Sequence, residues 1–205
     1  LDSARTVWRF TLANGNFAPS ADNRFHVFLM ADNPDLFGAV NGYAVGVNLT
    51  GTDKKLKLWR VTSGVAATNL ITTPLVWGSN MTVAVEVIRQ SSGQWELRYN
   101  TTNSFSNLTT AGLATDTTHL RTDVFGLVYR CTASRAGLLR LDDVRISQEV
   151  FSSLAVSENP VRVANGVTQC AIIGTAAHVV GNLVWTNSLG GSGSGAATTP
   201  NWTLN

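Results

Sequence analysis

The sequence predicts an all-β protein built as a sandwich or barrel, and three observations support this fold class. The clearest is the alternation in Gly93–Thr101, where Trp95 and Leu97 share one face and polar residues share the other. Many short segments of this kind are separated by turn residues such as Asn41-Gly42. No segment carries a convincing helical period.

Other strands follow from the same patterns. They are predicted at Thr6–Leu12, Arg24–Ala31, Gly42–Asn48, Lys55–Thr62, Met81–Arg89, Val124–Cys131 and Leu138–Ile146. Phe25–Ala31 and Val124–Cys131 are apolar on both faces, which predicts central positions in a sheet. Lys55–Thr62 instead places Lys57 and Trp59 opposite leucines, as expected for a strand with one open face.

A domain boundary is predicted near Gln148–Asn159, where the last strand of the first unit gives way to polar residues. We therefore expect residues 1–150 to form one domain and residues 151–205 to form a second. Strands of the second domain are expected near Val161–Val163, Thr168–Gly174 and Gly181–Asn187. The run Gly190–Gly195 is expected to be a long loop within that domain.

The two cysteines, Cys131 and Cys170, lie on either side of this boundary. Cysteines of secreted proteins usually pair within one fold. We therefore expect no disulfide between them and interpret both as small buried hydrophobes.

Composition indicates an extracellular setting and narrows the partners. Charged residues are only 14% of the 205, while Gly, Ser, Thr and Asn are abundant. The net charge of +2 comes from scattered residues, so no basic stripe is present for nucleic acid. No stretch approaches the roughly 20 apolar residues that span a membrane, and Leu1–Thr6 does not resemble a signal peptide.

Trp8–Ser147 resembles the concanavalin A-like lectin/glucanase superfamily, in the lamin-G-like form of large bacterial surface proteins. The stretches that carry the resemblance are Asn23–Asp32, Gly42–Val47, Leu58–Val61 and the closing strand Leu141–Ile146. This resemblance implies an antiparallel jelly-roll β-sandwich.

Val161–Asn205 resembles bacterial immunoglobulin-like repeats, through Gly174–Ala176, Val184–Asn187 and Asn201–Thr203. Trp185 fits the tryptophan that packs between the two sheets of such a sandwich. Proteins that join these modules are commonly adhesins or anchored surface proteins. The resemblance therefore implies a partial immunoglobulin-like β-sandwich in a cell-surface protein, with other modules or neighbouring subunits as partners.

The glycosidases of this superfamily show which residues catalysis would require. A retaining glycosidase needs two carboxyls about 5 Å apart on either side of the scissile bond. Asp142 and Asp143 are adjacent on a strand and point to opposite faces, and Glu86 and Glu96 stand alone on theirs. Glu86 and Glu96 meet only if their strands are neighbours, and the alternative is a solvated or Arg98-paired face. We expect no enzyme activity and no catalytic residues.

Glycan binding requires an exposed aromatic platform with hydrogen-bonding neighbours, because a sugar has an apolar face and a hydroxyl rim. Trp59 is the best candidate, because it shares a strand face with Lys57. The candidate ligand-binding residues are Trp59, Lys57, Glu96 and Arg98. The alternative for Trp59 is packing beneath a loop.

Metal sites have weak support in the sequence. The three histidines lie far apart without zinc-ligand spacing. Asp32-Asn33-Pro34-Asp35 offers oxygen ligands for calcium, and the same residues also encode an ordinary turn. No cofactor and no metal residues are predicted, with calcium kept open.

The leading hypothesis is a non-catalytic structural or adhesive module of a large secreted surface or filament protein. The alternative is a carbohydrate-binding module of a polysaccharide-degrading system. We also expect both domains to be completed by further polypeptide or by a neighbouring subunit. We expect no partner before Trp8 for the closing strand Leu138–Ile146, and the second domain is shorter than a sandwich of about 100 residues.

Overall fold

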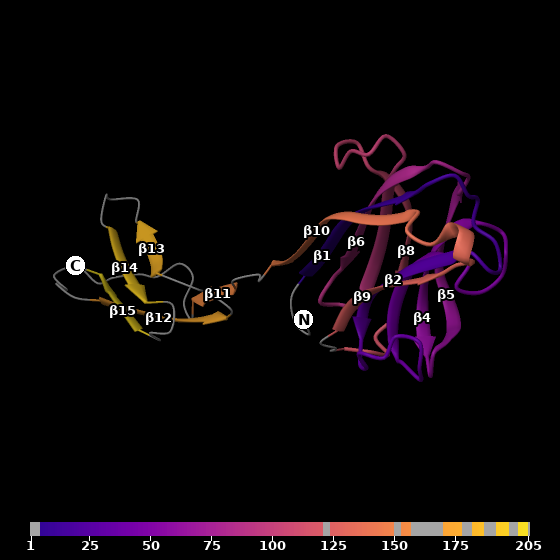
Figure 1. Cartoon of the computed structure of the whole chain (residues 1–205). Helices are drawn as coiled ribbons and strands as arrows, with labels where there is room; N and C mark the ends of the chain where they lie inside the picture. The colour runs from indigo at the N-terminus through magenta and orange to yellow at the C-terminus, as the bar shows by residue number, and fades with distance from the viewer. Residues whose placement is uncertain are drawn as a thin grey trace. The chain divides into compact units, whose positions relative to one another are not determined.

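The structure is a computed structural model that describes residues 5–120, 124–149, 153–156, 170–177, 182–186, 192–196 and 201–204. It divides the chain into two units, Leu1–Glu149 and Val150–Asn205. Each unit is built from antiparallel strands, most of which Figure 1 labels.

Two five-stranded antiparallel sheets form the first unit. Sheet A has the order β10 (Leu139–Glu149), β1 (Arg5–Asn14), β6 (Thr82–Arg89), β7 (Gln94–Asn100) and β8 (Thr109–Thr115). Sheet B has the order β5 (Val65–Val76), β4 (Lys55–Thr62), β3 (Gly42–Val47), β2 (Arg24–Ala31) and β9 (Val124–Arg130). The chain crosses between the sheets four times, as in a jelly roll. The predicted all-β sandwich is confirmed.

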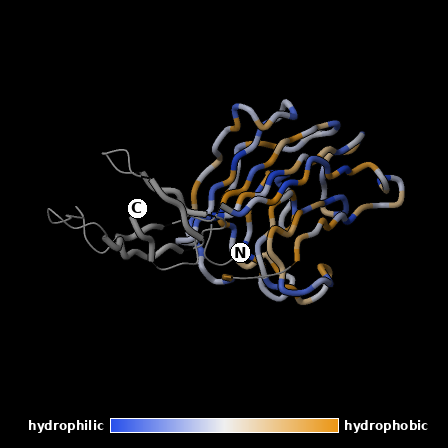
Figure 2. Tube along the Cα trace, turned by 90° about the vertical axis from the view of Figure 1, so that its left-hand side faces the viewer, coloured by the Kyte–Doolittle hydropathy of each residue, from blue (hydrophilic) through white to orange (hydrophobic). Residues whose placement is uncertain are grey.

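The inner faces of the two sheets enclose one aromatic-rich core. Trp8 and Trp95 of sheet A stack with ring centroids 5.8 Å apart, and Phe25 of sheet B packs edge-on against Trp77 at 5.1 Å. Trp95 and Leu97 are fully buried, so the alternation in β7 indicated the inward face correctly. Figure 2 shows hydrophobic (orange) and hydrophilic (blue) segments interspersed along the trace of this unit.

The closing strand β10 pairs with β1 along its length, with Trp8 opposite Ile146 and Leu12 opposite Leu141. The prediction that this strand lacks a partner is wrong, because β1 itself supplies the backbone groups. The register shifts near Asp143, whose φ of 53° marks a bulge in β10.

Strand β9 is an edge strand, which corrects the prediction of a central position. Its outward-facing residues are apolar because a loop, rather than another strand, covers them. Leu36, from the loop between β2 and β3, packs against a small cluster that includes Val128. A Cβ at Gly126 would lie 2.6 Å from Leu36 Cδ1, so the glycine leaves room for this loop.

A polar bracket, formed by Tyr43, Arg60, Trp95 and Asp116, ties the sheets together beyond the end of β8. Tyr43 Oη of sheet B donates to Asp116 Oδ1 at 2.6 Å, and Arg60 Nη1 donates to Asp116 Oδ2 at 2.7 Å. Trp95 Nε1 of sheet A donates to the Asp116 carbonyl at 3.2 Å. Burial raises the pKa of the Asp116 carboxyl, but hydrogen bonds from Tyr43 and Thr118 and the Arg60 charge outweigh it and hold the pKa below its usual value.

The second unit contains a three-stranded sheet and a hairpin. The sheet has the order β11 (Ser153–Val156), β12 (Cys170–Ala177) and β15 (Asn201–Leu204), and the hairpin joins β13 (Asn182–Thr186) to β14 (Ser192–Ala196). Part of the predicted Gly190–Gly195 loop is therefore a strand, since β13 offers it a backbone partner. The strand predicted at Val161–Val163 lies outside the described residues, and the immunoglobulin-like resemblance stays a prediction.

Cys131 follows β9 and carries a free, half-buried thiol. The side chain of Cys170 lies outside the described residues. The expectation that the two cysteines are unlinked stays a prediction.

Candidate functional site

The outer face of sheet A carries a chain of four alternating charges, formed by Arg9, Glu86, Arg98 and Glu96. Arg9 Nε lies 2.5 Å from Glu86 Oε2, and Arg98 Nη1 lies 3.3 Å from Glu86 Oε1. Arg98 also donates from Nε to Glu96 Oε1 at 2.6 Å and from Nη2 to Glu96 Oε2 at 3.0 Å. The hydrogen bonds from Arg98 to Glu96, and then the nearby Glu86, raise the pKa of the Arg98 guanidinium.

The hydrogen bonds between Arg98 and Glu96 confirm one of the two interpretations drawn from the sequence, namely that this face of the sheet is paired with Arg98. They follow from register, because Glu86 pairs directly with Arg98 across β6 and β7. Glu86 is only 1% exposed at its side chain, so both of its guanidinium partners are needed to offset its desolvation. The carboxylates of Glu86 and Glu96 thus both form ion pairs with arginine side chains.

Beside this network lies a groove of about 440 Å³, lined by Arg9, Phe105, Asp143, Val144 and Arg145. The Arg9 guanidinium lies 6.0 Å from the centre of the Phe105 ring, which fixes the ring at one wall. Val144 is 47% exposed, and Asp143 and Arg145 are exposed on β10. The groove therefore combines apolar surface with hydrogen-bonding groups of both signs. We call these five residues the sheet A groove.

The sequence-predicted residues do not form one site. Glu96 and Arg98 lie on the outer face of sheet A, whereas Trp59 and Lys57 belong to β4 of sheet B. Trp59 is fully buried in a cluster with Phe28 and Val40, so the prediction of an exposed platform is wrong. The alternative, packing beneath a loop, is confirmed, because Val40 and Leu36 of the loop before β3 belong to the same cluster.

Lys57 is held by an acidic neighbour and is largely buried. Its Nζ lies 2.6 Å from Asp53 Oδ2, and its side chain is 13% exposed. Burial raises the pKa of Asp53, but hydrogen bonds from Lys57 and Lys55 outweigh it and keep that pKa below its usual value. Lys57 therefore stabilises the loop before its own strand through its ion pair with Asp53.

The Asp32–Asp35 segment forms an ordinary turn. Asp32 accepts the Asn41 backbone N–H at 2.7 Å and the Asn41 amide at 2.8 Å. Asn33 Oδ1 accepts the Asp35 N–H at 2.9 Å. Within the described ranges, no three His, Cys, Asp or Glu side chains gather as a metal site. Calcium binding by this loop stays untested.

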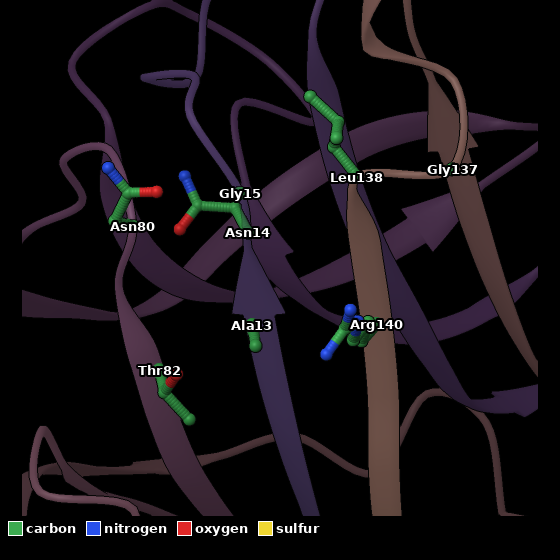
Figure 3. Close-up of a pocket in the computed structure, with 8 residues that line it drawn as sticks. All are labelled: Ala13, Asn14, Gly15, Asn80, Thr82, Gly137, Leu138 and Arg140. Atoms are coloured by element: carbon green, nitrogen blue, oxygen red, sulfur yellow. The ribbon is translucent and has the colours of Figure 1, made fainter.

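A second hollow, of about 290 Å³, lies where β1 ends and β10 begins. Figure 3 shows the amides of Asn14 and Asn80 on one side of it and Arg140 on the other. The Asn14 amide donates to the carbonyls of Phe17 and Gly78, and it accepts the Trp77 indole N–H at 3.0 Å. Because Asn14 is fully occupied in holding these loops, the hollow lacks a buried group that is free for a ligand.

Phe105 and Arg145 were not predicted from the sequence, and Asp143 was considered there only as a catalytic carboxylate. Phe105 stands in the polar segment Thr101–Thr109, and a lone aromatic side chain in such a loop was the available indication. Asp143 and Arg145 reach the groove through the bulge in β10, for which the sequence carries no clear pattern.

Comparisons of the chain with models of protein families, with curated proteins and with solved structures found no significant match. In the part of the chain that the structure describes, no helix has the length and apolar character needed to cross a membrane. The site must therefore be interpreted from its own geometry.

Proposed function

We propose that this chain is a non-catalytic adhesive module of a secreted surface protein, and that the sheet A groove holds a saccharide. The observation that carries the proposal is the pairing of Phe105 and Val144 with Asp143 and Arg145 in one groove. A sugar needs this combination, since its C–H face packs on apolar surface while its hydroxyls bond to charged groups. The low charge and hydroxyl-rich composition support an extracellular setting.

Binding without cleavage is favoured by the state of the nearest carboxylates. A glycosidase needs one carboxyl as a proton donor and another as base or nucleophile at the bond. Glu86 is fixed between Arg9 and Arg98, and both oxygens of Glu96 accept from Arg98. The oxygens of both carboxylates are therefore engaged by guanidinium groups rather than directed at a bond to be cleaved.

A carbohydrate-binding module of a polysaccharide-degrading system is the second candidate. The aromatic wall provided by Phe105 favours it, because such modules also hold sugars without cleaving them. The two candidates share the same groove and differ in the protein to which the module belongs.

The test is glycan-array binding of the full 205-residue chain, combined with an assay for released reducing ends. We expect at least one bound glycan, no reducing ends, and a loss of roughly 1–3 kcal/mol of binding free energy in Phe105→Ala. Leu120→Ala is the matched control, because Leu120 is 55% exposed but lies outside the groove.

Two results would overturn the proposal. One is a folded chain that binds no glycan. The other is release of reducing ends that disappears in Glu86→Gln or Glu96→Gln, which would make these carboxyls catalytic.

A further inference from the structure

A separate pocket of about 140 Å³ lies on the outer face of sheet B. Strands β2 and β9 supply Arg24, His26, Phe28, Val128 and Arg130, and the surrounding loops supply Leu36, Phe37, Leu49 and Gly64. We call these residues the sheet B pocket. No residue of the sheet A groove belongs to it.

Two of the residues that line this pocket are arginines on neighbouring strands. Arg24 pairs directly with Arg130 across β2 and β9. Like charges directly opposite in a sheet are destabilising. Among the described residues, neither guanidinium forms a salt bridge or hydrogen bond that would offset this repulsion. The sheet therefore presents positive charge that an incoming anion would neutralise.

The imidazole of His26 also lines the pocket. His26 is 5% exposed, and its Nδ1 is buried without a hydrogen-bond partner among the described residues. Burial, with a smaller effect from the Arg24 charge, lowers the pKa of His26 to about 4. Its strand neighbour in the sheet is Gly46, where a Cβ would lie 2.6 Å from His26 Cβ. The glycine thus allows β2 and β3 to approach closely at this position.

The rim of the pocket offers an aromatic surface. Phe37 is 77% exposed, the largest exposed fraction among the exposed large hydrophobic residues of the described chain. Its backbone N–H is bonded to Asp35 Oδ1 at 3.2 Å, so the turn holds Phe37 in place beside the pocket. The volume is below the roughly 300–1,000 Å³ of a drug-sized site, which suits one end of a ligand.

We propose that the sheet B pocket binds the carboxylate of an acidic saccharide. Arg24 and Arg130 hold the carboxylate oxygens by charge-assisted hydrogen bonds, and Phe37 contacts the C–H face of the same sugar. A flat, exposed aromatic ring next to two cations favours a sugar acid over an acidic peptide, whose carboxylates sit on flexible chains. This inference rests on the proposed function in taking saccharides as ligands, but it concerns a different site.

The experiment measures calorimetric binding of oligogalacturonate to the full chain, with its neutral methyl ester as the matched ligand. We expect Arg24→Gln and Arg130→Gln each to weaken binding of the acid by roughly tenfold to a hundredfold. Phe37→Ala is expected to weaken it by roughly tenfold. Arg140→Gln removes the same charge from an exposed position of sheet A and is expected to change nothing.

Folding is checked by melting the variants without ligand. Arg24→Gln and Arg130→Gln should melt at the same temperature as the parent chain or above it, because each removes the cross-strand repulsion.

The outcomes separate the two proposals. Binding of oligogalacturonate that survives both arginine variants but is lost in Phe105→Ala would overturn the sheet B pocket as its binding site. The proposed function would still stand in that case. Equal, arginine-dependent binding of a polyglutamate peptide would overturn the saccharide assignment. Equal affinity for the methyl ester would also overturn it, since the carboxylate would then be irrelevant. Failure to bind any glycan would overturn both proposals.

Discussion

Replacing Asp116 with alanine removes the acceptor that joins the two sheets beyond β8. The carboxylate accepts from Tyr43 Oη at 2.6 Å, from Arg60 Nη1 at 2.7 Å and from the Thr118 N–H at 2.9 Å. A hydrogen bond to a charged group contributes roughly 1.5–3 kcal/mol net, but bonds that share one acceptor do not add. Arg60 is 28% exposed at its side chain and also donates to Thr68, so part of its loss is recovered.

We therefore expect Asp116→Ala to lower the free energy of unfolding by about 2–4 kcal/mol. For a unit of this size, the melting temperature should fall by roughly 5–15 °C. Urea unfolding followed by tryptophan fluorescence measures the change, since Trp95 itself donates to the Asp116 carbonyl.

The matched control is Asp53→Ala, which removes a carboxylate that is 45% exposed at its side chain from the Lys57 pair. It should lower the free energy of unfolding by no more than about 1 kcal/mol. An Asp116→Ala variant that loses no more stability than Asp53→Ala would show that the hydrogen bonds of Asp116 do not hold the two sheets together. Tyr43→Phe, combined with Asp116→Ala in a double-mutant cycle, isolates the coupling of that pair.

Four further predictions follow from burial and protonation. Since the pKa of His26 in the folded chain, about 4, lies below its ordinary value of 6.5, the contribution of His26 to stability is present above pH 6.5 and is lost as pH falls toward 4. His26→Gln should flatten this dependence, and an imidazole NMR titration near 6.5 would contradict it. Burial and the Asp116 hydrogen bond raise the pKa of Tyr43 to about 12, so stability should fall as pH rises from 10 toward 12, and Tyr43→Phe should lack this fall. A phenolate absorbance titration near pH 10 would exclude that shift. Trp59→Ala should lower the free energy of unfolding by about 3–5 kcal/mol, and a urea-measured loss below about 1 kcal/mol would mean that the ring is not part of the core. A reductant should leave the melting temperature unchanged, and mass analysis that finds Cys131 and Cys170 linked would contradict this.

Strands with a strong pattern were predicted well from the sequence. Arg24–Ala31 and Lys55–Thr62 have the same bounds in the structure as in the prediction. Each is a continuous or alternating apolar run bounded by turn residues, so local chemistry and tertiary packing agree.

Two edge strands were missed. Val65–Val76 contains Pro74 and several hydroxyl residues, and Thr109–Thr115 consists mainly of small and polar ones. Both lie at sheet edges, where one side needs no apolar partner and proline is tolerated. Their sequences consequently lack the alternation that reveals half-buried strands.

The candidate sites depend on which strands and loops are neighbours in space, and the pattern of apolar residues along the sequence does not show this. Alternation placed Trp59 on the outer face of its strand, but it did not show that the loop before β3 covers that face. The same loop carries Phe37 to the rim of the sheet B pocket. The pairing of Arg24 with Arg130 arises only from the order of strands in the sheet.

Ligand binding without cleavage is tested most directly by titrating the isotope-labelled chain with oligogalacturonate and recording NMR spectra of protein and saccharide together. We expect the amide signals of Arg24, His26, Phe37 and Arg130 to shift in a saturable way while the saccharide spectrum shows no new reducing ends. The appearance of shorter saccharides, lost when Glu86 or Glu96 is replaced by glutamine, would contradict a non-catalytic binding module.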